Sequence, residues 1–199
     1  DWSGIIVKSD QMKNLLKIKK IEVVPNGVSF DTFHPINQKK ARSILNWNLE
    51  EKIILFNGHK SNPIKNYALA EKAINLCKKN IKIVEMKNLD QEKLNLYYNA
   101  CDVFLSTSLW EGSPNTIKEA MACNTNIIST NVGDVNYLFG KEKYNRICTF
   151  DPLEISTAIT DTLGVKKENN KGRERLIHLS LQGTDVAQKI IKLYHTILA

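Results

Sequence analysis

The chain has 199 residues, of which 42% are hydrophobic and 25% charged, a balance typical of one globular domain with a substantial core. The formal net charge is +7, and Lys outnumbers Arg by 24 to 4. Nucleic-acid binding is disfavoured, because the basic residues are scattered, Arg is scarce and no recognition motif is present. No apolar run is long enough to span a bilayer.

Short apolar runs alternate with helical patterns along the chain. In chain order they predict strands at 5–7 and 21–24, a helix at 39–46, a strand at 52–56, a helix at 67–79, a strand at 81–84, a helix at 91–99, a strand at 103–105, a helix at 114–123, strands at 126–129 and 147–150, and a helix at 152–163. Strands buried on both faces and separated by helices indicate an α/β fold, a Rossmann-like parallel sheet with helices on both faces. Ligands of such sheets bind beyond the carboxyl ends of the strands, so the site is expected at the turns 57–66, 85–90 and 106–113.

Two further segments carry a pattern of their own. Residues 165–175 are polar and basic, and we interpret them as an exposed connection. Near the C-terminus, apolar residues recur at helical spacing: Val186, Ile190, Tyr194 and Ile197, with Ala187, Ile191 and Leu198 beside them. This stripe packs either on its own domain or on a partner domain that the chain lacks.

The four cysteines, Cys77, Cys101, Cys123 and Cys148, form no C-x-x-C pair and have no His at ligand spacing. Buried free thiols in a reducing compartment are the expected state. No D-x-D pair occurs either, so the sequence predicts no metal site.

The run EGSPNTIKE, from Glu111 to Glu119, carries the chemistry. We expect Ser113 to cap a helix whose first residue is Pro114, so that first-turn amides point outward with the positive end of the helix dipole. Such a helix start can bind phosphate, although most isolated Ser-Pro-Asn starts bind only water. Two carboxylates beside it favour a sugar ligand, because carboxylate oxygens accept hydroxyl protons. The plainer alternatives are a solvated loop acid for Glu111 and, for Glu119, a surface glutamate that interacts with the helix dipole or pairs with a Lys.

These residues resemble a known family. The segment YNACDVFLSTSLWEGSPNTIKEAMACNTNIISTNVGD, residues 98–134, is similar to the signature region of retaining glycosyltransferases of family 4, which have the two-domain GT-B fold. VVPNGVSFDTFHP (23–35) resembles the start of the donor-binding half, and ILFNGHKSNPIKN (54–66) resembles the loop that contacts the donor diphosphate.

The resemblance assigns roles by position. It implies that Glu111 lies by the transferred sugar, that Glu119 holds the ribose, and that Lys65 meets the diphosphate, with Glu111 and Lys65 as the catalytic residues. The remaining diphosphate ligands it implies are Gly58, His59, Lys60, Gly112, Ser113, Asn115 and Thr116, and the base-binding loop is Met86, Lys87 and Asn88. The family usually has Arg after Gly58, where this chain has His59 and then Lys60, either of which could substitute. The chain also departs from the family where the base loop lacks a glycine, and at Asn124, which replaces a small residue.

The resemblance also implies a domain plan. Residues 1–20 match the end of an N-terminal acceptor domain, 21–182 form the nucleotide-sugar-binding domain, and 183–199 form a helix that crosses back to the missing half. We therefore expect a piece of a longer protein.

The function implied is transfer of a sugar, with retention, from a nucleoside diphosphate sugar to a glycan or lipid-linked acceptor, without a cofactor or metal. The fragment alone is expected to be inactive. The alternatives are a non-catalytic nucleotide-sugar-binding module, a GT-B-fold sugar-nucleotide epimerase and a basic interaction domain without a ligand. The Lys- and Asn-rich composition suits an AT-rich bacterial genome and polysaccharide biosynthesis in the cytoplasm, with possible peripheral association at the inner face of the membrane.

Overall fold

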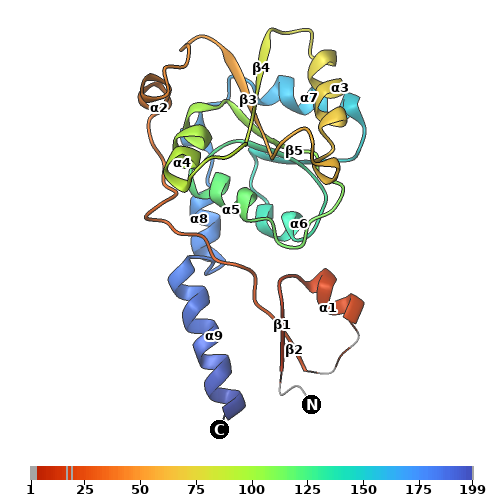
Figure 1. Ribbon diagram of the computed structural model, residues 1–199, viewed down its shortest axis with the longest axis vertical. Helices are drawn as coiled ribbons and strands as arrows, with labels where there is room; N and C mark the ends of the chain where they lie inside the picture. Colours follow the sequence, from red (N-terminus) through yellow and green to blue (C-terminus); the bar gives the residue numbers. More distant parts are fainter. Residues whose placement is uncertain (1–3, 17, 19, 199) are drawn as a thin grey trace.

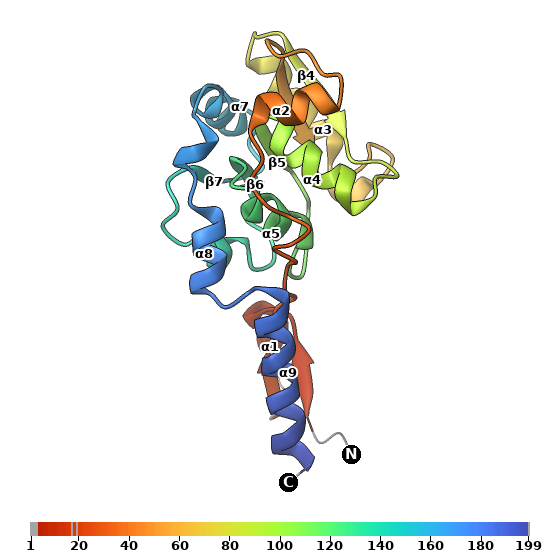
Figure 2. The ribbon, with the colours of Figure 1, turned by 90° about the vertical axis from the view of Figure 1, so that its left-hand side faces the viewer.

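The computed structural model describes residues 4–16, 18 and 20–198. Most of these form an α/β body around a five-stranded sheet. A smaller part, made of strands β1 (Ile5–Val7) and β2 (Ile21–Val23) and helix α1 (Asp10–Leu16), extends from one end of that body beside the C-terminal helix α9 (Gly183–Leu198), as Figures 1 and 2 show.

The five-stranded sheet is parallel throughout, with the strand order β4-β3-β5-β6-β7. Its strands are β3 (Lys52–Phe56), β4 (Ile81–Glu85), β5 (Val103–Ser106), β6 (Ile127–Thr130) and β7 (Asn145–Cys148). Every residue of β5 and β6 is buried, and so is every residue of β3 except the first, Lys52. This is what continuous apolar runs predict for strands covered on both faces. The predicted fold class is confirmed.

Alternate residues of each strand enter two separate cores. Ile53 and Leu55 point to one side with Phe104 and Ile127, where α4 (Gln91–Ala100), α5 (Asn115–Ala122), α6 (Val135–Phe139) and α8 (Gly172–His178) lie. Ile54 and Phe56 point to the other side, against α3 (Tyr67–Leu76) and α7 (Pro152–Thr162). Helix α2 (Gln38–Ile44) packs on α4 (Figure 1).

The connections reverse direction between β3 and β5. Strand β3 leads into α3 on one face, whereas its neighbour β5 leads into α5 on the opposite face. The two connections therefore diverge at the carboxyl ends of adjacent strands. We call the place between them the crevice, because open parallel sheets bind ligands at this position.

Strand β2 pairs with β1, not with the large sheet. Ile5 lies opposite Ile21, and Val24 N donates to Val7 O at 2.8 Å. The strand that opens the predicted domain at 21–182 thus pairs with the segment before it. No helix of the described residues is long and apolar enough to cross a bilayer.

The C-terminal apolar stripe divides along α9. Val186 is buried and Ile190 packs on the core of the main body, whereas Tyr194 remains 57% exposed. Farther along, Ile197 packs over Gly4, with its Cδ1 3.0 Å from the place that a Cβ on Gly4 would take. The beginning of the helix packs on its own domain, and its end lies beside the N-terminal segment.

The prediction that 165–175 is an exposed connection is only partly right, because Lys166, Glu168, Asn169, Lys171 and Glu174 are exposed whereas the other residues of the segment are buried or half-buried. The segment contains a 3-10 turn, Lys167–Asn169, and the start of α8, and Asn170 is fully buried. Its cations bind carbonyls at the ends of other helices: Lys167 Nζ donates to Tyr98 O and Asn99 O in α4, and Arg173 Nη1 donates to Ala122 O in α5. Basic side chains satisfy the last carbonyls of a helix, so a polar sequence here accompanies burial.

All four cysteines are free and buried, as predicted.

Several tight turns use asparagine in the left-handed region, at Asn46, Asn66, Asn88 and Asn124, with φ between 51° and 54°. Asn124, where the family has a small residue, also accepts a hydrogen bond from Arg173 N at 2.9 Å.

Candidate functional site

Helix α5 starts one residue later than the sequence predicted. Pro114 is the N-cap residue, and within the described part of the chain no side-chain hydrogen bond caps this end of the helix. Ser113 is not the cap, because its hydroxyl donates to Asp134 Oδ2 at 2.6 Å and accepts from Lys118 Nζ at 2.7 Å. Among the residues that the structure describes, the first-turn amides, including those of Asn115 and Thr116, are therefore left without an intrahelical or side-chain partner at the mouth of the crevice.

Glu111 and Lys65 form an ion pair across the crevice. Lys65 Nζ lies 2.7 Å from Glu111 Oε1, which also accepts from Ser108 Oγ at 2.9 Å. The pair joins the turn after β5 to the 3-10 turn Pro63–Lys65 after β3, so residues 46 positions apart meet where the two connections diverge.

Gly58 makes room for the lysine. Its φ is +120°, and a Cβ there would stand 2.9 Å from Lys65 Cγ. A hydrogen bond also fixes the backbone of Lys65, because Thr107 Oγ1 donates to Lys65 O at 2.9 Å. The ammonium therefore reaches Glu111 along a path that a side chain on residue 58 would block.

Glu119 lies more than one turn into α5 and is partly buried. Its Oε2 accepts a hydrogen bond from the fully buried Tyr98 hydroxyl at 2.9 Å. Burial raises the pKa of Glu119, while the Tyr98 bond and Lys118 act in the opposite direction. Burial, with Glu119 as the next cause, raises the pKa of Tyr98 well above its usual value. Among the described residues Glu119 forms no lysine ion pair, so the surface alternative does not hold.

Glu85, the last residue of β4, binds the loop that follows β3. Its Oε2 accepts from Lys60 N at 2.6 Å and lies 3.6 Å from His59 Nε2. Next to it, Met86 N donates to Gly58 O at 3.0 Å. The predicted base loop, Met86 to Asn88, thus lies directly beside the predicted diphosphate loop, although the Lys60 side chain is exposed.

Sequence reasoning missed a buried network behind the α5 mouth. Lys118 is fully buried, and burial lowers its pKa to about 8, with nearby Asp134 acting against the shift. Burial raises the pKa of Asp134, while the Ser113 bond and Lys118 lower it. The sequence did contain a signal for this burial. Met121 and Ala122 follow Lys118 by three and four residues, a spacing that places all three side chains on the same face of the helix, which is the buried one.

The turn after β6 packs directly against the backbone of Glu111 and Gly112. Gly133 has a φ of +57°, and a Cβ there would stand 2.4 Å from Gly112 O and 2.9 Å from Glu111 O. The backbones approach so closely that only glycine fits. Asn115 at the mouth is also contacted from the 25–27 turn, since Asn26 Nδ2 donates to Asn115 Oδ1 at 3.3 Å.

The structure brings most of the predicted residues together. Gly58, Lys65, Glu111, Gly112 and Asn115 surround the crevice between β3 and β5, and His59, Lys60 and Met86 lie along its β4 side. Within the described part of the chain, no group of three or more His, Cys, Asp or Glu side chains is arranged to hold a metal ion.

A parallel sheet of this order, with helices on both faces and polar loops at the reversal between β3 and β5, defines a domain of the GT-B glycosyltransferase type. A family model for glycosyl transferases group 1 matches residues 54–164, more than half of the chain. The chain belongs to this family.

Solved structures agree on the fold. Sucrose-phosphate synthase from Thermosynechococcus elongatus is 21% identical with a TM-score of 0.88, and the match covers 100% of this chain and 59% of that one. Anabaena HepE, solved in complex with UDP-glucose, is 14% identical with a TM-score of 0.78, covering 98% and 64%. The C-terminal domain of the group 1 protein LpcC from Francisella tularensis is 15% identical with a TM-score of 0.61, covering 76% and 97%. No curated protein sequence matches the chain.

Proposed function

We propose that this chain is the donor-binding half of a retaining glycosyltransferase of family 4. The reaction transfers a sugar from a nucleoside diphosphate sugar to a hydroxyl of a glycan or lipid-linked acceptor. The observation that carries the proposal is the Lys65–Glu111 pair at 2.7 Å, located where the connections after β3 and β5 diverge and beside the uncapped start of α5.

The diphosphate is assigned to Lys65 and the α5 mouth. The amides of Asn115 and Thr116 carry the positive end of the helix dipole, which favours an anion. When the sugar leaves, negative charge develops on the diphosphate, and a positioned ammonium stabilises that charge. The backbone of Gly58, Gly112 and Ser113 can approach the phosphates closely, and His59 and Lys60 are the side chains available in place of the family's arginine.

The sugar and ribose are assigned to the two glutamates. In the free protein Glu111 is held by Lys65, so a diphosphate that attracts the ammonium would leave the carboxylate to face the sugar and stabilise charge that develops on its ring. Glu119 has one oxygen bound to Tyr98, which fixes the carboxylate and leaves the other oxygen as an acceptor for ribose hydroxyls.

The base is assigned to the loop of Met86, Lys87 and Asn88. The bond from Met86 N to Gly58 O supports this assignment, because it joins the base loop to the diphosphate loop. Among the similar structures, HepE was solved with UDP-glucose, which makes uridine the first base to test.

The acceptor is assigned to a half of the enzyme outside this chain. The chain spans only 59% of the sucrose-phosphate synthase chain, whereas it matches nearly all of the LpcC C-terminal domain, which supports a C-terminal position. In this domain plan the acceptor domain ends with residues 1–20, the donor binds to residues 21–182, and the helix of residues 183–199 crosses back to the acceptor domain. A bacterial role in polysaccharide assembly, in the cytoplasm or at the inner face of the membrane, completes the proposal.

The direct test is a calorimetric titration of the protein with UDP, GDP, ADP and their glucose conjugates. One diphosphate should bind with release of heat and the matching nucleoside should bind much more weakly. The absence of binding by every nucleotide would contradict the donor site. Incubating the complete enzyme with the donor and determining the anomeric configuration of the product then separates retaining transfer from a binding module or an epimerase.

A further inference from the structure

A buried network of three side chains fixes the hydroxyl of Ser113 just before α5 begins. Lys118 Nζ donates to Ser113 Oγ at 2.7 Å, and the Ser113 hydroxyl donates to Asp134 Oδ2 at 2.6 Å. Lys118 is fully buried and Asp134 is only 7% exposed. The hydroxyl therefore lies between an ammonium group and a carboxylate, and each of them holds it by one hydrogen bond.

The packing of two turns brings this network together. A Cβ on Gly133 would stand 2.4 Å from Gly112 O, so the two glycines are in close contact, and the residues that follow them, Asp134 and Ser113, lie within hydrogen-bond distance of each other. Lys118 reaches the same hydroxyl from within α5. Three separate positions of the sequence thus converge on one oxygen atom.

Stability does not account for the two buried charges of the network. Removing opposite charges from water is unfavourable, and apolar side chains of similar size in their place usually leave a protein as stable or more stable. Burial lowers the pKa of Lys118 to about 8, so the folded protein disfavours the ammonium form. We therefore look for the role of the charges in the hydroxyl that they hold.

A Ser113 hydroxyl without these partners would be available to cap α5. Serine at a helix start accepts a hydrogen bond from the amide two or three residues later, which here belongs to Asn115 or Thr116. No side chain of the described residues makes such a bond at this helix start, and Asn115 is exposed. These two amides are the ones assigned to the diphosphate, so a cap on either of them would compete with the ligand.

We propose that Lys118 and Asp134 are positioning residues, which hold the Ser113 hydroxyl away from the first turn of α5 and keep the amides there open to the diphosphate. This role rests on the proposed function, because it is defined toward the donor diphosphate. Both residues act through Ser113 and not by contact with the ligand.

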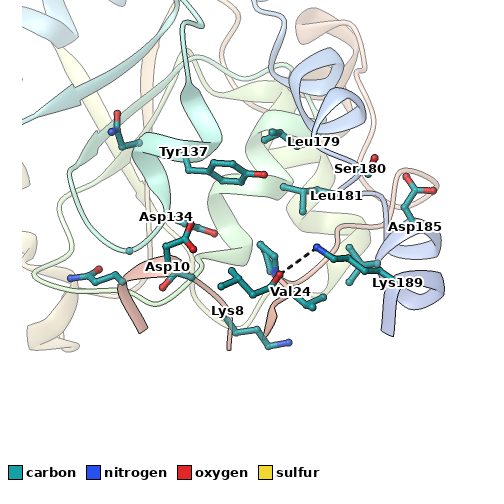
Figure 3. Close-up of a pocket in the computed structure, with 17 residues that line it drawn as sticks. Lys8, Asp10, Val24, Asp134, Tyr137, Leu179, Ser180, Leu181, Asp185 and Lys189 are labelled. Carbon is teal, nitrogen blue, oxygen red and sulfur yellow. Dashed lines mark hydrogen bonds between the residues drawn. The ribbon is translucent and has the colours of Figure 1, made fainter. Parts of the chain in front are cut away.

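The surroundings of Asp134 allow both charges to be replaced at once. Asp134 borders a cavity of about 470 Å³, which Val24 and Leu181 also line (Figure 3). The cavity gives an apolar side chain at position 134 room beside these two residues. Lys118→Met/Asp134→Leu, the pair variant, therefore frees the hydroxyl and removes one positive and one negative charge, so that the net charge stays the same.

Amide hydrogen exchange in the ligand-free protein, followed by NMR, tests the position of the hydroxyl. In the pair variant the amide of Asn115 or Thr116 should exchange several-fold more slowly than in the parent, because Ser113 now binds it. Adding Ser113→Ala to the pair variant should restore the faster exchange. Unchanged exchange in the folded pair variant, or slow exchange that persists after Ser113→Ala is added, overturns the proposal.

Calorimetry with UDP tests the consequence for the ligand. The pair variant should bind UDP roughly fivefold more weakly than the parent, which is the effect of one capping bond, and adding Ser113→Ala should recover most of the loss. Arg146→Met/Asp161→Leu, which removes an exposed ion pair between β7 and α7, is the matched control and should bind like the parent. A loss that Ser113→Ala does not reverse overturns the proposal.

Thermal unfolding shows whether each variant is folded, and Lys118→Leu/Asp134→Val replaces the pair variant in both measurements should that variant not fold. If the parent binds none of UDP, GDP and ADP, the proposed function fails. The exchange measurement needs no ligand, so it still decides whether Lys118 and Asp134 control the hydroxyl.

Discussion

The role of Lys65 can be tested by Lys65→Met, which removes the ammonium but keeps methylene groups against Gly58. A hydrogen bond to a charged group is worth about 1.5–3 kcal/mol, and each 1.4 kcal/mol is a factor of ten, so UDP should bind roughly 10–100-fold more weakly. Uridine has no phosphate for Lys65 to meet, so its affinity should change little.

The variant should remain folded. The side chains of Lys65 and Glu111 are 20% and 19% exposed, so water partly screens their ion pair, and losing it should cost about 1 kcal/mol of unfolding free energy. In a domain of this size that corresponds to a fall in Tm of about 2–4 °C. A scan of thermal unfolding checks that the binding loss is not a loss of structure.

Isothermal titration calorimetry with UDP and with uridine measures the difference directly. Lys65→Arg should recover part of the UDP affinity, and Lys40→Met, a change at an exposed cation on α2 that has no assigned ligand, should show how much of any loss follows from net charge alone. Equal losses for UDP and uridine, or a loss in Lys40→Met as large as in Lys65→Met, would refute the assignment of Lys65 to the diphosphate.

Three further predictions concern the residues around the crevice. Glu119→Ala should weaken uridine and UDP alike, by roughly tenfold, because the ribose loses its acceptor; calorimetry that finds unchanged affinity contradicts the ribose role. Lys118 has a pKa of about 8 when folded, below its ordinary value of 10.5, so between these pH values the unfolded chain holds a proton that the folded chain has released. The unfolding free energy of the parent, measured by urea denaturation against Lys118→Met, should therefore rise with pH from about 8 to 10.5, by about 1.4 kcal/mol per unit of the pKa shift; a difference that is flat or falls with pH shows that the buried ammonium is not destabilised. Gly133→Ala should lower the unfolding free energy by about 2 kcal/mol or more, because its Cβ would meet Gly112 O at 2.4 Å in a left-handed conformation, and a urea transition at the parent midpoint would show that the turn can relax.

The sheet was predictable because its evidence is local. The apolar runs at β3, β5 and β6 are uninterrupted, and strands buried on both faces produce such runs. The crevice followed from the same reasoning, since parallel strands place their carboxyl ends at one edge. The pairing of Lys65 with Glu111 was not predictable, because it depends on where two separate loops meet in space.

The misses share one physical cause, which is burial of polar side chains. Arg173 and Lys167 belong to a basic segment that looked exposed, yet they bind helix carbonyls. Ser113 looked like a helix cap, yet the buried Lys118 takes its oxygen. A sequence shows that a side chain is charged but does not show which distant carbonyl or hydroxyl will satisfy it.

The asparagines at left-handed turns have a thermodynamic consequence. Asn46, Asn66, Asn88 and Asn124 occupy backbone conformations that glycine usually supplies. A glycine would leave the denatured ensemble freer at each place, so folding would lose more entropy, whereas asparagine tolerates the same φ at small steric expense. Asparagine at these turns therefore lowers the conformational entropy of the unfolded chain relative to glycine. This contribution to stability comes from the unfolded state and cannot be read from the contacts of the folded one.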